Sequence, residues 1–295
     1  MHGFGLARPA VLNPPLPALP ADLPEQVSRA LREDIGPGDV TAGLIPAEAR
    51  MRARVISREA AVLCGRAWFE ETFRQLDGRI LVRWHAAEGQ RVGREALLCE
   101  LEGPARSLLT GERTALNFLQ LLSGTATQTA RYVAAVQGSG CRILDTRKTI
   151  PGLRTAQKYA VRCGGGDNHR IGLYDRVLIK ENHIAAAGSI AAAVAAARQQ
   201  APGIRVEVET ENLAEFGQAL AAGADIIMLD DFSHADMRAA VALNRAHSAR
   251  AELEASGSVT LETIGAIAAT GIDCISIGAL TKHVQAIDLS MRFED

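Results

Sequence analysis

The stretch from Asp145 to His183 concentrates cations and glycines around the ends of two short apolar runs. It reads DTRKTIPGLR, then GGGDNHR, then VLIKENH. The net charge of the whole chain is only −2, so one mildly acidic protein carries one concentrated cationic segment. Such a segment suits a small, highly anionic ligand better than a polyanion spread over a surface. We therefore expect an anionic substrate and no nucleic-acid partner. The cations concerned are Arg147, Lys148, His169, Arg170 and Lys180.

The positions of these cations relative to the apolar runs differ. The Arg-Lys pair directly follows CRILDT, and Lys180 ends RVLIK, so both stand where a short strand is expected to end. Arg154, Lys158 and Arg162 instead recur every four residues, as on one face of a helix. We interpret these three mainly as a solvated helix face and the strand-end cations as part of a site.

The composition indicates an ordinary globular enzyme. The chain has 295 residues, of which 47% are hydrophobic and 22% charged, enough for one large domain or two smaller ones. No run reaches the 18 or more apolar residues of a membrane helix, and prolines interrupt the N-terminal stretch where a signal peptide would need a compact apolar core. The five cysteines form no CxxC pair, so we expect a cytoplasmic protein without disulfides or a zinc knuckle. Cys163 near the glycine run stays open as a nucleophile, although no base accompanies it in sequence.

The first half of the chain predicts an arm followed by a mixed domain. Residues 1–24 are rich in proline and alanine and lack periodicity, as in an extended arm. A helix is expected at 25–33, and a turn reading EGQRVGREALL resembles the hairpins of biotinyl and lipoyl domains without their lysine. Further predicted strands lie at 52–58, 61–65, 79–85 and 95–101, with helices at 67–76, 108–122 and 127–137, the last two split by SGT.

From Cys141 onward, short apolar strands alternate with alanine-rich helices. Six strands are predicted: CRILDT, RVLIK, RVEVE, DIIMLD, RAELEAS and DCISIG. Strands of this kind, buried on both faces and joined by helices, form a parallel sheet. Each of them ends in a group that could bind or react, and a β/α barrel gathers such ends on one face. A doubly wound sheet would scatter them along an edge, so we favour a barrel with fewer than eight units.

Several chemistries are open at these strand ends. The segments EASGS and SIGAL, which follow two of the predicted strands, contain small residues that let the backbone approach a phosphate. A helix N-terminus is expected after each of them. Glu209 and Asp230 could hold a divalent ion or ribose hydroxyls. Lys180 at the end of a strand also fits a Schiff-base aldolase, which would leave the many arginines without a role.

These motifs resemble the quinolinate phosphoribosyltransferase family. The resemblance covers nearly the whole chain after the first 24 residues, and DTRKT followed by GGGDNHR is its most specific part. It also includes LREDIGPGDVTA, LTGERTALNFLQLLSGTAT, VLIKENH, EVE, MLDDF, EASG and SIGALT. One departure is Ser258, where family members commonly carry glycine or asparagine.

The resemblance implies an α/β fold, with an N-terminal open α/β sandwich domain plus a C-terminal incomplete parallel β/α barrel. The implied division is an arm at 1–24, a sandwich at 25–115 together with 283–295, and a catalytic barrel at 116–282. It further implies a homodimer in which Arg113 of one subunit enters the site of its partner.

The implied reaction joins quinolinate to phosphoribosyl pyrophosphate (PRPP) with Mg²⁺ and no organic cofactor, releasing nicotinate mononucleotide, pyrophosphate and CO₂. By the same resemblance, the groups around quinolinate are Arg113, Arg147, His169, Arg170 and Lys180. Lys148 with magnesium would hold the pyrophosphate, and Glu209 and Asp230 would face the ribose and its metal. The catalytic set is then Lys148, Lys180, Glu209 and Asp230. The remaining substrate contacts would be Thr146, Ser256, Gly257, Ser258, Ile277, Gly278 and Ala279.

Two other functions remain possible on the same scaffold. One is phosphoribosyl transfer to another aromatic carboxylate such as nicotinate, whose single carboxylate would leave this many cations underused. The other is a non-catalytic anion-binding protein, which would have no need for both the acidic pair and the cations. Release of CO₂ that depends on quinolinate would separate the three.

Overall fold

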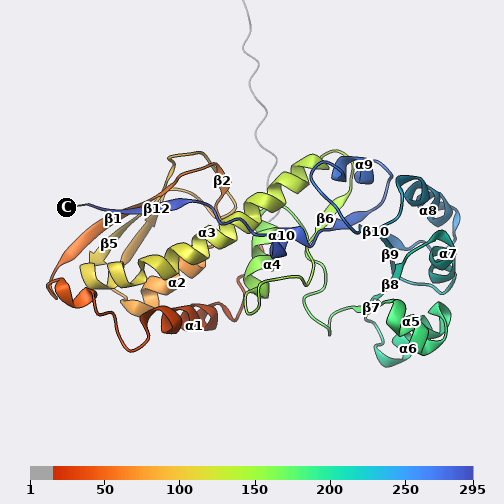
Figure 1. Cartoon of the computed structure of the whole chain (residues 1–295), viewed down its shortest axis with the longest axis horizontal. Helices are drawn as coiled ribbons and strands as arrows, with labels where there is room; N and C mark the ends of the chain where they lie inside the picture. The colour runs from red at the N-terminus through yellow and green to blue at the C-terminus, as the bar shows by residue number, and fades with distance from the viewer. Residues whose placement is uncertain (1–15, 295) are drawn as a thin grey trace, which may run out of the picture.

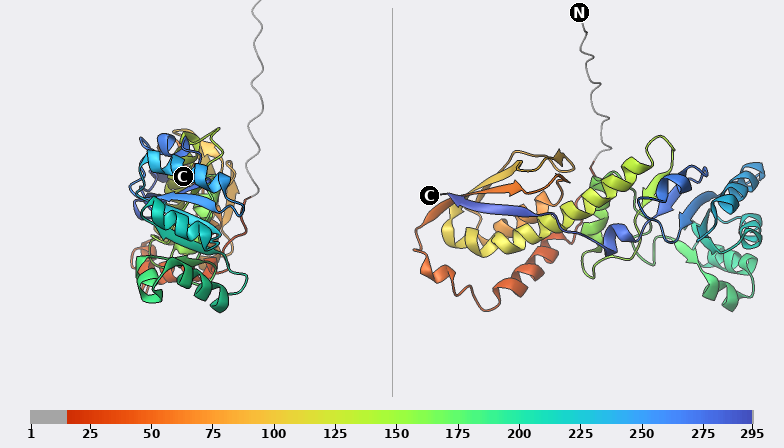
Figure 2. Two further views of the ribbon diagram at one scale, coloured as in Figure 1. Left: turned by 90° about the vertical axis from the view of Figure 1, so that its right-hand side faces the viewer. Right: turned by 45° about the horizontal axis from the view of Figure 1, so that its top comes forward.

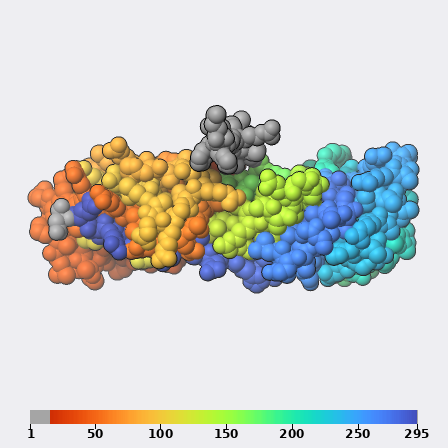
Figure 3. Space-filling view, turned by 90° about the horizontal axis from the view of Figure 1, so that it is seen from above, coloured from red at the N-terminus to blue at the C-terminus, as the bar shows by residue number. Residues whose placement is uncertain are grey.

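The chain forms an elongated molecule with two lobes. The computed structural model describes residues 16–294, so most of the arm predicted at 1–24 lies outside the described residues. An antiparallel sheet with its helices makes one lobe, and a parallel sheet with its helices makes the other (Figure 1). Figure 3 shows the same outline from above, with the C-terminal half of the long central helix between the lobes.

The N-terminal lobe is a four-stranded antiparallel sheet covered by helices on one face. Its strands are ordered β12 (Leu289–Glu294), β1 (Arg50–Ser57), β5 (Leu97–Pro104) and β3 (Leu81–Trp84). In β1 the arginines at 50, 52 and 54 alternate with Met51, Ala53 and Val55, so one face is charged and the other apolar. The apolar face packs on α2 (Arg66–Leu76) and α3 (Ala105–Ala135). The lobe also holds α1 (Leu23–Ile35), a 3-10 turn at Ala42–Leu44, and the strand pair β2 (Ala61–Val62) and β4 (Arg91–Val92).

The 31-residue helix α3 corrects the sequence prediction of two helices split at SGT. Ser123, Gly124 and Thr125 are all buried inside one continuous helix. The Thr125 hydroxyl donates to the Leu121 carbonyl at 3.3 Å, and the Ser123 hydroxyl exchanges hydrogen bonds with the backbone of Cys64. Gly124 lies where a Cβ would collide with the backbone carbonyl of residue 285. Small residues occupy this part of the helix because the segment that returns from the barrel crosses it closely at Gly124.

The C-terminal lobe is a six-stranded parallel sheet, as the strand-helix alternation predicts. The strands are β6 (Arg142–Leu144), β7 (Val177–Ile179), β8 (Val206–Thr210), β9 (Ile226–Asp230), β10 (Glu252–Ser256) and β11 (Cys274–Ser276). Their order is β6-β11-β10-β9-β8-β7. In the described part of the chain β6 and β7 do not pair with each other, so the barrel is incomplete.

Helices separate these strands along the chain and pack outside them (Figure 2). The helices between the strands are α4 (Arg154–Cys163), α5 (Glu181–Ala187), α6 (Ile190–Gln200), α7 (Leu213–Ala221), α8 (His234–Ala246) and α9 (Ile264–Ala268), and α10 (Ala279–Lys282) follows β11. After α10 the chain runs back along α3, where Ile287 N donates to the Gln120 carbonyl at 3.1 Å, and ends as β12 in the first lobe (Figures 1 and 2). No helix within residues 16–294 combines the length and apolar character needed to span a membrane.

Candidate active site

The carboxyl ends of the parallel strands bring most of the predicted site residues to one edge. Lys180 directly follows β7, Glu209 lies near the end of β8, and Asp230 ends β9 beside Ser256 of β10. The segments 146–148 and 277–279 follow β6 and β11, which pair with each other in parallel. Parallel strands all point the same way, so residues from positions 146 to 279 converge because of the topology.

The acidic pair has two different environments. Glu209 forms an ion pair with Lys180, whose side chain is 41% exposed while that of Glu209 is 14% exposed. Asp230 forms no ion pair among the described residues and is only partly buried. The lysine therefore already has a counter-charge, whereas the Asp230 carboxylate is available to a ligand.

The Arg-Lys pair after β6 is held by its backbone and leaves its side chains available. Lys148 N donates to the Thr146 hydroxyl at 3.1 Å, and the Lys148 carbonyl accepts from the Thr281 hydroxyl at 2.9 Å. The Lys148 chain passes directly over Gly278, where a Cβ would lie 2.9 Å from Lys148 Cδ. The buried Nε of Arg147 has no hydrogen-bond partner among the described residues. A buried guanidinium donor without a protein acceptor can bind an anionic ligand.

The loop GGGDNHR is anchored by a buried ion pair. The Asp145 carboxylate is fully buried and accepts from Lys158 Nζ at 2.5 Å, Asn168 Nδ2 at 2.6 Å and His169 N at 2.9 Å. Lys158 Nζ also donates to the His169 carbonyl at 3.0 Å. These contacts fix the loop against the end of β6, and with it the direction of the following Arg170.

The interpretation of the α4 cations as a solvated face is therefore wrong for Lys158, which is 2% exposed. The helix itself is confirmed. Arg162 forms an ion pair with Asp167 of the glycine loop, and Arg154 donates to the Thr149 hydroxyl and the Ile171 carbonyl. The four-residue spacing correctly predicts that all three side chains lie on one side of the helix. That side faces the loops at 145–149 and 166–171 rather than solvent.

His169 lies inside the barrel, with both ring nitrogens in contact with protein groups. Nε2 lies 3.1 Å from Glu207 and 3.5 Å from Glu254, and Nδ1 accepts the Arg170 N–H at 2.8 Å. Burial lowers the pKa of the imidazole, and the two carboxylates raise it, to about 9 overall. The Nδ1 contact opposes protonation, because an imidazolium has no lone pair there. A pKa of about 9 would make the ring an imidazolium at neutral pH, but an imidazolium cannot accept the Arg170 N–H at Nδ1. As long as that contact is made, we assign the neutral ring with its proton on Nε2.

The carboxylates beneath His169 were missed by the sequence analysis. Glu207 and Glu254 are fully buried, and Arg176 Nη1 lies 3.1 Å from Glu207. Burial raises the pKa of the Glu254 carboxyl, and the Glu207 charge raises it further. Acidic letters inside the apolar strands RVEVE and AELEAS were the signal, because charged residues are almost never fully buried unless paired.

Arg170 and Arg147 repel each other across the site. Burial lowers the pKa of the Arg170 guanidinium, and the Arg147 charge lowers it further. Two like charges held near each other are costly unless an anion joins them. The arrangement therefore suits a ligand with adjacent negative groups.

The two late strand exits differ from the sequence expectation in one respect. After β11, Gly278 caps α10 directly, but after β10 the next helix, α9, begins only at Ile264, so no helix N-terminus follows EASGS directly. Gly257 instead has φ 98° and lies where a Cβ would collide with Asp231. Ser258 also has positive φ, 42°. The small residues at this exit serve a tight backbone turn.

Two candidate residues are not brought to the strand-end site. Arg113 is exposed on α3, in the part of that helix whose neighbours Leu108, Ala115 and Leu116 pack on the N-terminal sheet. Cys163 is buried beside Cys64 and Glu88, so its thiol does not face the strand ends. The structure therefore gives Cys163 no role as a nucleophile there, and Arg113 needs another explanation.

The chain matches two protein-family models and several known proteins. The model of the N-terminal domain of quinolinate phosphoribosyl transferase matches residues 39–123, and that of its C-terminal domain matches residues 125–292. The probable nicotinate-nucleotide pyrophosphorylase [carboxylating] of Bacillus subtilis is 44% identical over 260 residues, covering 88% of this chain and 89% of that one. The human nicotinate-nucleotide pyrophosphorylase [carboxylating] is 38% identical over 276 residues and 92% of each chain.

A solved structure agrees with the sequence matches. The nicotinate-nucleotide pyrophosphorylase from Francisella tularensis superposes with a TM-score of 0.90 at 50% identity, covering 94% of this chain and 98% of that one. Both lobes and their order along the chain are thus shared with the relatives. The chain belongs to the quinolinate phosphoribosyltransferase family.

Proposed function

We propose that this protein is a decarboxylating phosphoribosyltransferase, which converts quinolinate and PRPP to nicotinate mononucleotide, pyrophosphate and CO₂ in NAD biosynthesis. The observation that carries the proposal is the pair of guanidinium groups near the strand ends. The buried Nε of Arg147 has no partner among the described residues, and the Arg147 charge acts on the Arg170 guanidinium. Quinolinate has two adjacent carboxylates, for which planar guanidinium groups are the natural partners.

The remaining strand-end groups suit PRPP. Lys148 would hold the leaving pyrophosphate, and Lys180, already charge-paired with Glu209, would contact the substrates as a cation. Thr146, the exit at 256–258 and the exit at 277–279 would surround the 5′-phosphate. The enzyme's task is to position the pyridine nitrogen at the anomeric carbon and to stabilise the departing charge, with no protein nucleophile.

His169 has a supporting role in this proposal. Both of its nitrogens contact protein groups, so we propose that it fixes the direction of Arg170, and that it meets quinolinate only if the ring turns. This refines the direct contact expected from the family resemblance.

Magnesium fits the acidic pair. Asp230 and Glu209 lie on adjacent strands, and Mg²⁺ is usually held by one or two carboxylates together with substrate phosphates. When bound, the ion would neutralise charge on the pyrophosphate. The Asp230 carboxylate is the group free to hold it, and Glu209 could follow if Lys180 moves to the substrate.

The aldolase alternative is weaker than at the outset. A Schiff-base lysine must be neutral to attack a carbonyl, whereas Lys180 is partly exposed and ion-paired. The amine is therefore engaged by a carboxylate and open to solvent, unlike a lysine held in an apolar pocket to attack a carbonyl.

The decisive assay follows nicotinate mononucleotide and CO₂ with quinolinate, nicotinate or nicotinamide as acceptor. Losing one carboxylate would leave a partly buried guanidinium unpaired, at about 2–5 kcal/mol, so kcat/KM for nicotinate should fall at least about 30-fold. Equal efficiency with nicotinate would overturn the proposal in favour of a different acceptor.

We further propose a homodimer in which Arg113 acts in the partner's site. Arg113→Ala and Lys180→Ala should each be folded and nearly inactive. After subunit exchange their mixture should regain at most about one quarter of wild-type activity, because half the dimers are mixed and one of their two sites is intact. If exchange is demonstrated and no activity returns, Arg113 acts in its own subunit or nowhere.

A further inference from the structure

The loop that follows Arg170 presents two large apolar side chains to solvent. Leu173 is 75% exposed and Tyr174 is 76% exposed. The loop is nonetheless well fixed, because the Asp175 carboxylate accepts from Ile171 N at 2.7 Å and from Gly172 N at 2.9 Å. The Tyr174 ring lies so close to Gly172 that a Cβ there would collide with it. A rigid turn with an exposed apolar tip is typical of an interaction site.

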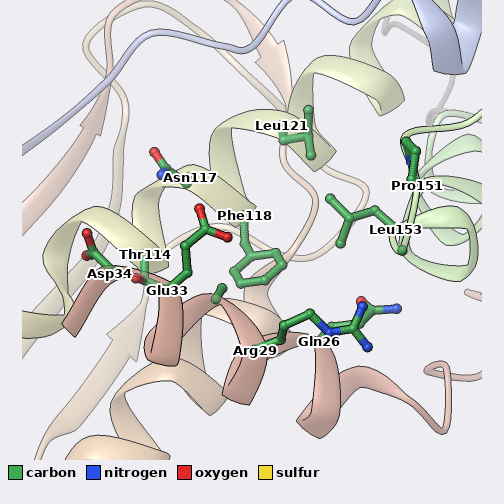
Figure 4. Close-up of a pocket in the computed structure, with 12 residues that line it drawn as sticks. Gln26, Arg29, Glu33, Asp34, Thr114, Asn117, Phe118, Leu121, Pro151 and Leu153 are labelled. Carbon is green, nitrogen blue, oxygen red and sulfur yellow. Dashed lines mark hydrogen bonds between the residues drawn. The ribbon is translucent and has the colours of Figure 1, made fainter. Parts of the chain in front are cut away.

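A cavity with apolar walls and a polar lining, into which such a tip could fit, lies beside α1 and α3. Figure 4 shows it between α1 and α3, closed at one end by the segment 151–153. Its volume is about 300 Å³, and its lining residues come from α1, α3 and the segment 151–153. Phe118, Leu121 and Leu153 give it apolar walls, and Glu33, Asp34 and Asn117 line it with polar groups.

The position of this cavity relative to Arg113 suggests its occupant. Thr114 and Asn117 line it, so the cavity begins one residue beyond Arg113 on the same helix. The tip begins three residues beyond Arg170 in sequence. If Arg113 enters the partner's cation cluster, as proposed above, the Arg170 loop of that partner would come close to the α1–α3 surface, since Asn117 lies one helical turn after Arg113.

We propose that the tip of one copy, Leu173–Tyr174, docks into the α1–α3 cavity of a second copy. This inference rests on the proposed exchange of Arg113 and says how the two copies are held in register. Tyrosine suits the cavity, because its ring is apolar and its hydroxyl can bond to Asn117 or Glu33. The acidic groups Glu33 and Asp34 then also face the cationic mouth of the partner barrel, so charge and shape agree.

Cross-linking tests the contact directly. The native cysteines in the described chain are all buried, so cysteines introduced by Asn117→Cys and Tyr174→Cys should react selectively with a short bismaleimide. We expect most chains of the double variant to run as covalent dimers on a denaturing gel. The matched control combines Asn117→Cys with Leu243→Cys, since Leu243 is also exposed (51%) but lies on α8; it should stay monomeric on the gel. Equal cross-linking of both pairs, or none of the first, would overturn the docking.

Sedimentation equilibrium supplies a second measurement. Tyr174→Asp should raise the dimer dissociation constant about 30-fold or more, as expected for an aromatic anchor at an interface, and Leu243→Asp should leave it unchanged. Both positions are exposed in one copy, so neither change should prevent folding. An unchanged dissociation constant for Tyr174→Asp would contradict the inference.

The outcomes keep the two proposals apart. If wild-type protein turns over quinolinate and the Arg113 and Lys180 variants complement each other while the tip cross-link fails, only the docking is wrong. If the cross-link forms specifically but quinolinate is not a substrate, the proposed reaction is wrong and the interface stands.

Discussion

Replacing Lys158 by methionine should destabilise the protein far more than a surface lysine change. Lys158 is 2% exposed, and the carboxylate it meets, Asp145, is fully buried. Without the lysine, Asp145 keeps only the neutral donors Asn168 Nδ2 and His169 N. Removing one member of a buried ion pair costs about 3–5 kcal/mol, and the unpartnered His169 carbonyl adds to the same loss. A solvated lysine would instead change stability by at most about 0.5 kcal/mol.

Urea unfolding followed by circular dichroism measures this difference, with Lys282→Met as the exposed control. The double variant Lys158→Met, Asp145→Asn should recover part of the loss, because no buried charge remains. In Lys158→Met the pKa of Asp145 would be raised by burial without a cation to offset it. Its charge then costs stability at neutral pH, and the deficit should shrink as the pH falls below that raised pKa. A Lys158→Met variant within 1 kcal/mol of wild type at pH 7 would refute the reasoning.

Three further outcomes are expected. Gly124→Ala should cost about 1–3 kcal/mol, because its Cβ would collide with the returning C-terminal segment. The control Gly217→Ala, with open space around it in α7, should be neutral or stabilising by up to about 1 kcal/mol; equal costs in urea unfolding would contradict the crossing. At pH 7, ¹⁵N NMR of labelled histidine should show His169 protonated at Nε2 alone, and a doubly protonated ring would rule out the Arg170 contact at Nδ1. Excess chelator should abolish turnover and magnesium restore it, while Asp230→Ala and Glu209→Ala should impair use of PRPP more than binding of quinolinate; full turnover in chelator with no residual metal would exclude the ion.

Much of the architecture follows from local sequence patterns. The six strands after Cys141 were predictable, because each is a short apolar run ending in a polar group, and such runs between helices form parallel sheets. The sequence also predicts that the strand-end residues lie at one edge of the sheet, because the carboxyl ends of parallel strands lie together. Glu209, Asp230 and Ser256 are cases of this kind.

What the sequence could not decide depends on contacts between distant segments. Lys158 has the spacing of a surface cation, and only its approach to Asp145, 13 residues earlier, makes it a buried one. The letters SGT are typical of a turn, but here they lie inside one helix, because the segment at residue 285 crosses the helix at Gly124. Glu207 and Glu254 meet only because β8 and β10 bring them to His169 inside the barrel. The period of apolar residues depends only on neighbours along the chain, so the sequence by itself determined the strands and the polar residues at their ends. The burial of a charged side chain and the partner it meets depend on neighbours in space. Only the tertiary structure therefore decided which charged residues support the site and which face the ligand.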